Sequence, residues 1–586
     1  MYIYGINGPV VKVKPSDELK MLELVKVGED ELIGEVIGIE KEYAVVQVYE
    51  GTTGLTIGEK VSGSGMPFSV QLAPGILSNI FDGIERPLNK IAELSGSFIS
   101  RGLKLTNLDE TKKWKVAILA KAGDRVHGGS IIGQCQESRT IIHKIMIPPN
   151  VSGVIREIVP DGEYTITEPL VKVELDSGGI AQYPMLQQWP IREKRPVLSR
   201  KAAVKPFITG QRVIDTLFPI AKGGTAAVPG GFGTGKTMTQ HQIAKWSDAD
   251  IIVYIGCGER GNEMTQVLEE FSELADPRTG GSLMDRTVLI ANTSNMPVAA
   301  REASIYTGIT LAEYYRDMGY NVAIMADSTS RWAEALREIS GRLEEMPAEE
   351  GFPAYLPSRI AGFYERAGVT SNLNGTTGSV TIIGAVSPQG GDFSEPVTQN
   401  TKRFTRSFLT LDKQLAYARH YPAINWLTSY SEYIEDLTPW FSEHVQHDFM
   451  DCRAEIVKIL QEESNLMEIV KLSGGDVLPD DQKLTLEIAR VVRIGFLQQN
   501  AYHKNDTYVP LPKQYRMMKL IIKLYRVSER LVGEGIPMSY IKDSNFYEEI
   551  VKVKYEIDND HLERFDEYEK KIDQFYDDMK NAFNAR

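Results

Sequence analysis

The sequence predicts a multidomain α/β protein in which two β-rich modules precede a parallel-sheet domain and a helical domain ends the chain. Three observations support this fold class. The 586 residues exceed what a single hydrophobic core normally organises. Short β-branched runs with turn residues between them fill two stretches of the first 190 residues. Apolar strand patterns then alternate with helical patterns, until the strand patterns stop near residue 430.

The boundaries follow these changes of pattern. In the first stretch, β-branched runs at 35–40 and 43–50 precede closely spaced glycines, which predicts a small barrel. In the second, runs such as 141–147 and 154–159 are separated by Pro-Pro, Ser-Gly and Asp-Gly turns. The predicted parts are an N-terminal β-barrel at 1–70, a connecting segment at 71–109, a second β-rich domain at 110–190, an α/β domain at 191–430 and a C-terminal helical domain at 431–586.

The final helical stretch carries an apolar stripe amid dense charge. We interpret it as a helix that packs on its own domain, with a partner-binding helix as the alternative. The residues of the stripe are Leu562, Phe565, Ile572, Tyr576, Met579 and Phe583.

Composition narrows the functional classes. The net charge of −14 disfavours general nucleic-acid binding, because phosphate backbones are bound by Lys and Arg. The three cysteines form no CxxC pair and fit a reducing compartment. No signal-peptide pattern opens the chain, and the longest uncharged run, at 367–391, is too rich in Gly, Ser, Thr and Asn to span a membrane. We therefore expect a cytoplasmic protein that reaches a membrane only through partners.

A glycine-rich loop provides the first chemical motif. Residues 230–237 match G-x-x-x-x-G-K-[ST], between a short apolar strand at 225–228 and a helical pattern at 238–246. Glycines let backbone N–H groups approach phosphates, Lys236 supplies charge to the β- and γ-phosphates, and the Thr237 hydroxyl suits Mg²⁺. The motif predicts binding of Mg·ATP and cleavage of its β–γ bond. The residues expected at the nucleotide are Gly230, Gly231, Phe232, Gly233, Thr234, Gly235, Lys236 and Thr237.

Two acidic strand ends provide the next motifs. An apolar run at 251–255 leads to Glu259 and Arg260, at the edge where α/β sheets place ligands. Alone, this pair could be a surface salt bridge, but the phosphate loop upstream favours a catalytic carboxylate and a phosphate-binding arginine. The strand pattern at 321–327 ends in Asp327, a Walker B acid that would orient Mg²⁺ through water. Arg331 follows and could reach the nucleotide or pair with Glu334.

Several longer sequence segments resemble those of the catalytic A subunits of V-type and A-type rotary ATPases. They are Ile208-Thr-Gly-Gln-Arg-Val-Ile214, the phosphate loop, residues 256–263, 291–302 and 325–336, and Glu395-Pro-Val-Thr-Gln-Asn400. The resemblance covers essentially the whole chain. It implies a β-barrel, a RecA-like P-loop nucleotide domain and a helical C-terminal domain. It also implies that residues 110–190 are an inserted β-rich bulge domain, which marks the catalytic type of chain.

The resemblance also implies roles for individual residues. Lys236 and Thr237 match the phosphate and Mg²⁺ contacts, Glu259 the carboxylate that polarises water, Arg260 its neighbour at the γ-phosphate, and Asp327 the Walker B acid. Tyr421 and Tyr502 match two aromatic residues that sandwich adenine. From the sequence alone, these tyrosines would be interpreted as core aromatics. Thr234 stands where eukaryotic members have a cysteine, so the resemblance implies a bacterial or archaeal chain without that redox switch.

The implied assembly is a ring of alternating A and B subunits with central rotor and peripheral stalk subunits, peripheral to the cell membrane. It would couple ATP to H⁺ or Na⁺ transport, with Mg²⁺ and ATP or ADP bound and no nucleic acid. Two alternatives stay open. One is a non-catalytic subunit like B, against which an intact Lys236, Thr237 and Glu259 argue. The other is a Rho-like hexameric RNA helicase, disfavoured because residues 1–70 contain more acidic residues than lysines and no arginine.

One possible metal motif is set aside. His444-x-x-His447 has neither a cysteine nor an acidic partner at zinc spacing, so a solvated helix face is the favoured interpretation. No Ser-His-Asp arrangement is identifiable either.

Overall fold

The computed structural model describes residues 1–96 and 99–584, which divide into two compact units. The first unit contains Met1–Ala203, Lys222–Thr225 and Ala249–Phe404. The second unit contains Val204–Ala221, Ala226–Asp248 and Thr405–Arg586. Residues of the predicted α/β domain at 191–430 therefore occur in both units, because the chain passes between them several times.

The N-terminal part of the first unit is a six-stranded antiparallel barrel. Its strand order is β1-β2-β5-β4-β3-β6, and backbone hydrogen bonds from Ile3 to Glu59 and from Val61 to Met1 join the first and last strands. Alternate side chains such as Val11, Val25 and Val46 fill its interior. The strands are β1 (Tyr2–Asn7), β2 (Val10–Lys14), β3 (Glu23–Val27), β4 (Leu32–Ile39), β5 (Ala44–Val48) and β6 (Val61–Pro67).

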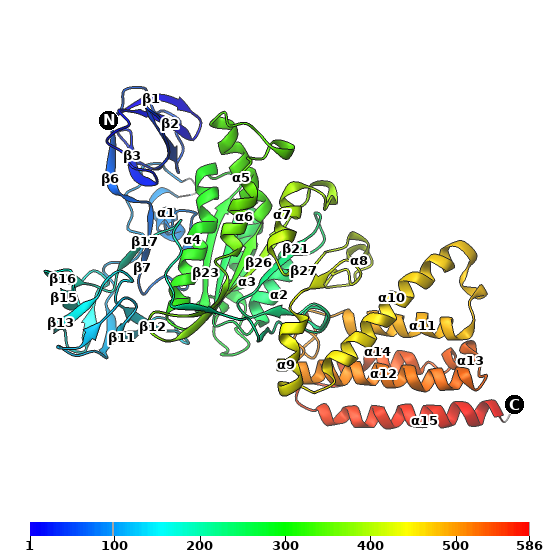
Figure 1. Ribbon diagram of the computed structural model, residues 1–586. Coiled ribbons are helices and arrows are strands. Elements are labelled where there is room, and N and C mark those ends of the chain that lie inside the picture. The colour runs from blue at the N-terminus through cyan, green and yellow to red at the C-terminus, as the bar shows by residue number, and fades with distance from the viewer. Residues whose placement is uncertain (97–98, 585–586) are drawn as a thin grey trace. The chain divides into compact units, whose positions relative to one another are not determined.

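Two four-stranded sheets form the inserted β-rich part (Figure 1). Their orders are β10-β13-β15-β16 and β12-β11-β9-β14. A two-stranded ribbon of β7 (Ser69–Leu72) and β17 (Gln187–Pro190) joins the chain before the insertion to the chain after it. The inserted strands are β9 (Trp114–Ile118), β10 (Arg125–Val126), β11 (Ile131–Gln136), β12 (Ile142–Met146), β13 (Gly153–Ile158), β14 (Gly162–Tyr164), β15 (Val171–Leu175) and β16 (Ile180–Tyr183).

A parallel sheet organises the rest of the first unit. Its central order is β26-β24-β22-β23-β8, and these strands are almost completely buried, as parallel strands covered on both faces are. The edge strand β8 comes from the segment predicted only as a connection, which also forms α1 (Leu88–Ser95). The strands are β8 (Ile80–Phe81), β22 (Ile251–Glu259), β23 (Thr287–Thr293), β24 (Asn321–Asp327) and β26 (Thr377–Val386), with β25 (Gly368–Ser371) and β18 (Ser199–Lys201) antiparallel beyond β26.

Helices cover this sheet. The buried helix α4 (Val298–Asp317) packs against β22, β24, β26 and β23, and also against α5 (Figure 1). Eighteen of its residues are buried, so α4 is a core helix without a solvent face. Besides α1 and α4, the described part of the first unit contains the α-helices α3 (Gly261–Glu273), α5 (Thr329–Arg342), α6 (Leu356–Tyr364) and α7 (Pro396–Phe404).

In the second unit, two short strands continue the sheet beyond the strand that precedes the phosphate loop. β21 (Thr225–Pro229) pairs in parallel with β27 (Ser407–Phe408), which pairs antiparallel with β28 (Tyr430–Ser431). Helix α2 (Lys236–Trp246) follows the loop, and α8 (Lys413–Tyr417) follows β27. β19 (Pro206–Phe207) and β20 (Ile220–Ala221) form a separate antiparallel pair.

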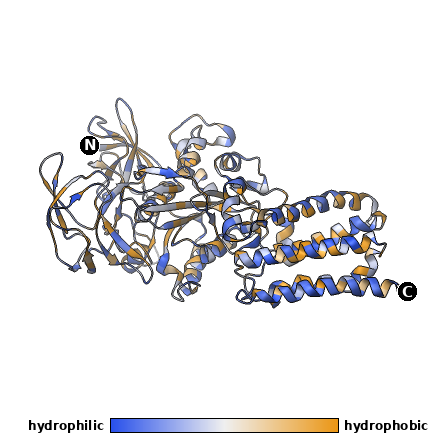
Figure 2. Cartoon of the chain, turned by 60° about the horizontal axis from the view of Figure 1, so that its bottom comes forward, coloured by the Kyte–Doolittle hydropathy of each residue, from blue (hydrophilic) through white to orange (hydrophobic). Residues whose placement is uncertain are grey.

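The C-terminal part of the second unit is helical. Figure 2 shows hydrophobic and hydrophilic colours on opposite sides of its long helices. In the last helix, Phe565 and Ile572 of the predicted stripe are buried, whereas Tyr576, Met579 and Phe583 are half-buried. Tyr568 and Phe575, which the stripe did not include, complete the buried face. The helix packs on α12, which favours the interpretation of the stripe as an intradomain contact. The helices are α9 (Ile434–His444), α10 (Phe449–Ser473), α11 (Asp480–Val491), α12 (Leu511–Gly533), α13 (Met538–Lys542), α14 (Phe546–Glu556) and α15 (Phe565–Asn584).

Among residues 1–96 and 99–584, no helix has both the length and the apolar character that a membrane span needs.

Candidate active site

The loop between β21 and α2 has the geometry that close packing around phosphate requires. Gly233 and Gly235 have φ of 78° and 85°, left-handed values that favour glycine. A Cβ on Gly230 would lie 2.6 Å from Thr234 Oγ1 and 2.7 Å from Leu411 Cβ, so glycine is needed there for space. The Thr234 hydroxyl donates to the Gly231 carbonyl oxygen at 2.8 Å and closes the loop.

Lys236 is the first residue of α2 and lies over this loop. Its ammonium group donates to the carbonyl oxygens of Gly230 and Gly231, at 2.8 and 3.0 Å. The N-terminus of α2 adds the partial positive charge of the helix dipole at the same position. The half-buried Thr237 follows in the first turn, and its hydroxyl is a hard oxygen ligand. These features give the loop the hydrogen-bond donors and the positive charge that suit the phosphate groups of a nucleotide.

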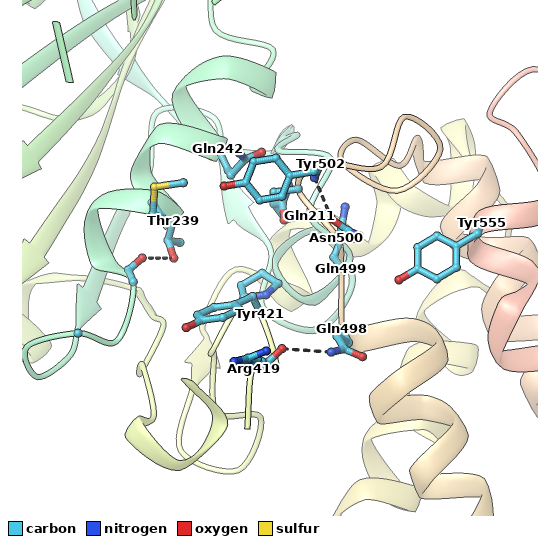
Figure 3. A pocket seen from close by; sticks show the side chains of 15 residues that line it. Gln211, Thr239, Gln242, Arg419, Tyr421, Gln498, Gln499, Asn500, Tyr502 and Tyr555 are labelled. Carbon is cyan, nitrogen blue, oxygen red and sulfur yellow. Dashed lines mark hydrogen bonds between the residues drawn. The ribbon is translucent and has the colours of Figure 1, made fainter. Parts of the chain in front are cut away.

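A cavity of about 480 Å³ adjoins the loop within the second unit (Figure 3). Gly233 and Gly235 form part of its wall, and Tyr421 and Tyr502 project toward it from two separate segments. The two tyrosines are 45% and 91% exposed, so their interpretation as core aromatics is wrong. Exposed aromatic rings beside a phosphate loop offer apolar faces for a nucleobase.

A buried polar network holds the wall that presents Tyr502. Arg212, fully buried, pairs with Asp506 and donates to the carbonyl oxygens of Phe496 and Gln498. Asp506 also accepts the backbone N–H of Asn500 at 2.7 Å, and Gln499 accepts that of Arg212 at 2.9 Å. Sequence reasoning did not assign a role to these residues, although Arg212 lies in the string 208–214. A buried arginine needs several acceptors, and only the folded chain shows which ones.

In the first unit, two acidic residues lie at the C-terminal ends of neighbouring parallel strands. Glu259 ends β22, and Asp327 ends β24; the register pairs Gly256 with Asp327. Asp327 is 2% exposed and accepts a hydrogen bond from the Tyr254 hydroxyl at 3.1 Å. The strand β22 runs four residues past the predicted apolar core, with a bulge between Cys257 and Glu259 that re-aims the last side chain.

The surroundings of Glu259 favour its neutral form. Burial, the nearby Asp327 carboxylate and a hydrogen bond with Glu263 raise the pKa of Glu259 to about 8. An acid with a pKa near neutrality can accept or donate a proton under ordinary conditions. Such a shifted carboxyl group at a strand end is typical of a catalytic acid–base residue.

The two candidate arginines lie near this carboxyl group but differ in setting. Arg260 is exposed and directly precedes α3, next to Glu259 in the chain. Arg331, on the first turn of α5, forms a salt bridge with Glu334 at 2.9 Å, one of the two possibilities expected for it. A Cβ added to Gly258 would lie 2.7 Å from the Cβ of Arg331, so Arg331 packs directly against this glycine.

The histidine pair gives no sign of a metal site. His444 stacks on Trp440 with ring centroids 4.6 Å apart, and His447 lies beyond the end of α9. Within residues 1–96 and 99–584, no group of three or more His, Cys, Asp and Glu side chains is arranged to hold a metal ion.

Known proteins resemble the chain over nearly its full length. It is 61% identical over 577 residues to "V-type ATP synthase alpha chain 2" of Clostridium tetani, covering 98% of this chain and 97% of the relative. It is 55% identical over 579 residues to the corresponding chain of the A-type ATP synthase of Methanopyrus kandleri, covering 98% of both. The chain belongs to the V-type and A-type ATP synthase alpha-chain family.

Family descriptions match the parts of this alpha-chain family member in order. They are the "ATP synthase alpha/beta family, beta-barrel domain" at 3–65, the "barrel-sandwich domain" at 105–192, the "nucleotide-binding domain" at 210–431 and the "C-terminal domain of V and A type ATP synthase" at 438–541. The predicted fold class is thereby confirmed. A solved structure of the type III secretion ATPase EscN from enteropathogenic E. coli shares the fold, with a TM-score of 0.63 at 21% identity over 89% of this chain and 99% of that one.

The family binds nucleotide, and the donor atoms on this chain also fit magnesium. Thr237 and Asp327 offer a hydroxyl and a carboxylate, the hard oxygen ligands that Mg²⁺ prefers. Asp327 is almost fully buried, so a bound cation with its waters would compensate its charge.

Proposed function

We propose that this chain is the catalytic subunit of a rotary ion-translocating ATPase, which hydrolyses or synthesises Mg·ATP and couples that reaction to rotation and to H⁺ or Na⁺ transport. The observation that carries the proposal is the phosphate loop beside a cavity into which Tyr421 and Tyr502 project. The names of the relatives, which are chains of V-type and A-type ATP synthases, support the same function. They favour it over a non-catalytic member of the ring and over an RNA helicase.

The phosphate loop has the binding role in this proposal. Lys236 would exchange its two loop carbonyls for the β- and γ-phosphate oxygens, which are stronger acceptors because they are charged. The backbone of residues 230–235 would surround the phosphates, with Phe232 at the exposed edge of the loop. Tyr421 and Tyr502 would stack on the adenine base.

Glu259 has the chemical role. Hydrolysis needs a base that orients the attacking water and takes its proton, and synthesis needs the same group to return it. With a pKa of about 8, the ionised fraction of Glu259 near neutral pH can accept the proton during hydrolysis, and the protonated fraction can return it during synthesis. Arg260 and Arg331 would add positive charge near the γ-phosphate.

Magnesium, when bound, would neutralise charge that develops on the phosphate oxygens. Thr237 would hold it directly through its hydroxyl, and Asp327 would hold it through water. Tyr254 orients the Asp327 carboxylate by its hydrogen bond at 3.1 Å.

Full activity would also need a partner. An arginine supplied by a neighbouring chain typically raises phosphoryl-transfer rates by about 10³–10⁵. Of the local candidates, Arg331 already pairs with Glu334. We therefore propose that B subunits alternate with this chain in a ring and supply that arginine, while a central stalk acts on the C-terminal helices. Peripheral stalk subunits and a membrane sector would complete an assembly on the cytoplasmic side of the membrane.

The test is a reconstitution. The purified chain alone should hydrolyse ATP weakly, and adding the candidate B subunit should raise turnover by orders of magnitude. A B subunit whose finger arginine is replaced by alanine should assemble without this gain. Full activity of the isolated chain would contradict the shared site, and turnover that stayed weak in an assembled ring would contradict the catalytic role.

A further inference from the structure

A second cavity, of about 370 Å³, lies in the first unit and shares no residue with the phosphate loop or with the acidic strand ends. The linker after the inserted domain, the C-terminal end of α4 and the chain around β25 form its wall. Its charged lining residues are Lys194, Arg195, Arg200, Glu313, Arg316 and Glu365.

Arg195 is the residue of this wall whose hydrogen-bonding capacity is used least. It is 4% exposed, and its Nε donates to Asp317 Oδ2 at 2.6 Å. Its Nη1 is buried and has no hydrogen-bond acceptor among the described residues. The guanidinium lies over the rings of Trp189 and Tyr314, 4.9 and 5.4 Å from their centroids. The rings hold the group in place but do not satisfy its strongest donors.

Arg316 adds a second buried guanidinium, which is 2% exposed. Its Nε and Nη2 donate to Asp317 Oδ1 at 3.1 and 2.7 Å, so Asp317 serves both arginines. Its Nη1 is 3.8 Å from Glu313 Oε1, too far for a hydrogen bond. Glu313 is instead bound by Arg366 through both oxygens, at 2.9 and 2.8 Å. The buried cluster therefore contains three arginines and two carboxylates.

The exposed rim adds one more uncompensated cation. Lys194 pairs with Glu365 at 3.2 Å, and these two charges cancel. Among the residues that the structure describes, Arg200 donates only to carbonyl oxygens, those of Ala367 and Glu365. With the buried cluster, the cavity has an excess of two positive charges. A buried uncompensated charge is costly to keep without an anion.

We propose that this cavity binds a tetrahedral oxyanion of the phosphate class, either free phosphate or the phosphate group of a small metabolite. A phosphate dianion matches the excess of two positive charges. Its oxygens accept the forked donors that arginine presents, including the unused Nη1 of Arg195 and of Arg316. The cavity volume leaves room for the rest of a small phosphate ester.

The proposal is tested with the full chain that carries Lys236→Ala, so that phosphate bound at the phosphate loop does not dominate the signal. Calorimetric titration with inorganic phosphate should show one site. Phosphate and sulfate should raise Tm in a saturable manner, and sodium chloride at equal ionic strength should not. The titration is then repeated with a phosphate monoester such as glycerol phosphate. Tighter binding of the monoester than of free phosphate indicates a metabolite site, and tighter binding of free phosphate indicates a site for the free ion.

Variants at the rim locate the site. Arg200→Ala should weaken phosphate binding about tenfold, the usual scale for losing a charged contact. Lys201→Ala is the matched control, since this neighbouring lysine of β18 donates to Thr377 and does not line the cavity. Arg195→Lys, which keeps the charge but loses the fork, should abolish the titration while the circular dichroism spectrum stays unchanged. Absence of the phosphate heat in the Lys236→Ala chain, or equal binding by the Arg200→Ala and Lys201→Ala variants, would overturn the proposal.

Discussion

Replacing Glu259 by glutamine should affect stability and turnover in opposite directions. The variant keeps the shape of the side chain but cannot ionise. The wild-type pKa rises from its ordinary value of 4.5 to about 8, first because of burial, then because of Asp327 and Glu263. A carboxyl group with a raised pKa destabilises the fold once it must ionise. The wild-type stability is therefore full below pH 4.5 and falls as pH rises from 4.5 to about 8.

The magnitude follows from the same shift. Each pKa unit corresponds to about 1.4 kcal/mol, so at pH 7 the wild-type protein loses on the order of 3 kcal/mol that the glutamine variant keeps. We expect the unfolding midpoint of Glu259→Gln to exceed that of the wild type by a few degrees at pH 7, and by little at pH 5. Turnover of the reconstituted ring should fall at least about 10²-fold while Mg·ATP still binds.

Thermal unfolding at pH 5, 7 and 9 and nucleotide titration measure both effects. The difference between wild type and variant in the infrared C=O band of protonated carboxyl groups should titrate near pH 8; taking the difference removes the contribution of Glu85, whose pKa burial also raises to about 8. Glu263→Gln is the informative second variant, because it removes a neighbour that raises the pKa and should shift the infrared midpoint to lower pH. Glu259→Gln that lost stability at pH 7, or lost nucleotide affinity in step with turnover, would refute the assignment and make Glu259 a binding or folding residue.

Two further substitutions test the phosphate loop and the cavity beside it that Tyr421 and Tyr502 line. Lys236→Ala should abolish turnover of the ring and weaken nucleotide binding, since it removes a charged contact to two phosphates. Replacing the exposed Lys458 by alanine is the control and should change neither turnover nor binding. Wild-type hydrolysis by Lys236→Ala would contradict the role of the loop. Tyr502→Ala should weaken ATP binding about five- to tenfold in calorimetry and leave Tm unchanged, because its ring is 91% exposed, and Tyr502→Phe should bind normally. Equal affinity of the alanine variant would remove Tyr502 from the base site.

Local patterns in the sequence were sufficient for several features. The glycines of the phosphate loop, Lys236 and Thr237 all lie within eight consecutive residues, 230–237, and the flanking strand and helix form where the patterns predict them. Asp327 ends its strand as expected, because the apolar run and the acid that follows it are contiguous. The order of barrel, insertion, α/β part and helices also follows from pattern, since strand and helix periodicities differ at the scale of a few residues.

Other features depend on residues that are far apart in the sequence. The chain at 71–109 was predicted as a plain connection, yet Ile80 and Phe81 add an edge strand beside β23, a pairing that no local pattern encodes. Tyr421 and Tyr502 look like core aromatics in isolation, and only the folded chain leaves them exposed beside the same cavity.

The sequence by itself determined which groups can do chemistry, because residue identity and short-range spacing are local properties. The tertiary structure decided the environments in which they act. Arg212 and Asp506 are 294 positions apart, and their buried pair holds the wall that presents Tyr502. Likewise, the pKa of Glu259 is raised by burial and by Asp327 on another strand. Burial and electrostatic energy depend on distance in space, and only folding sets that distance.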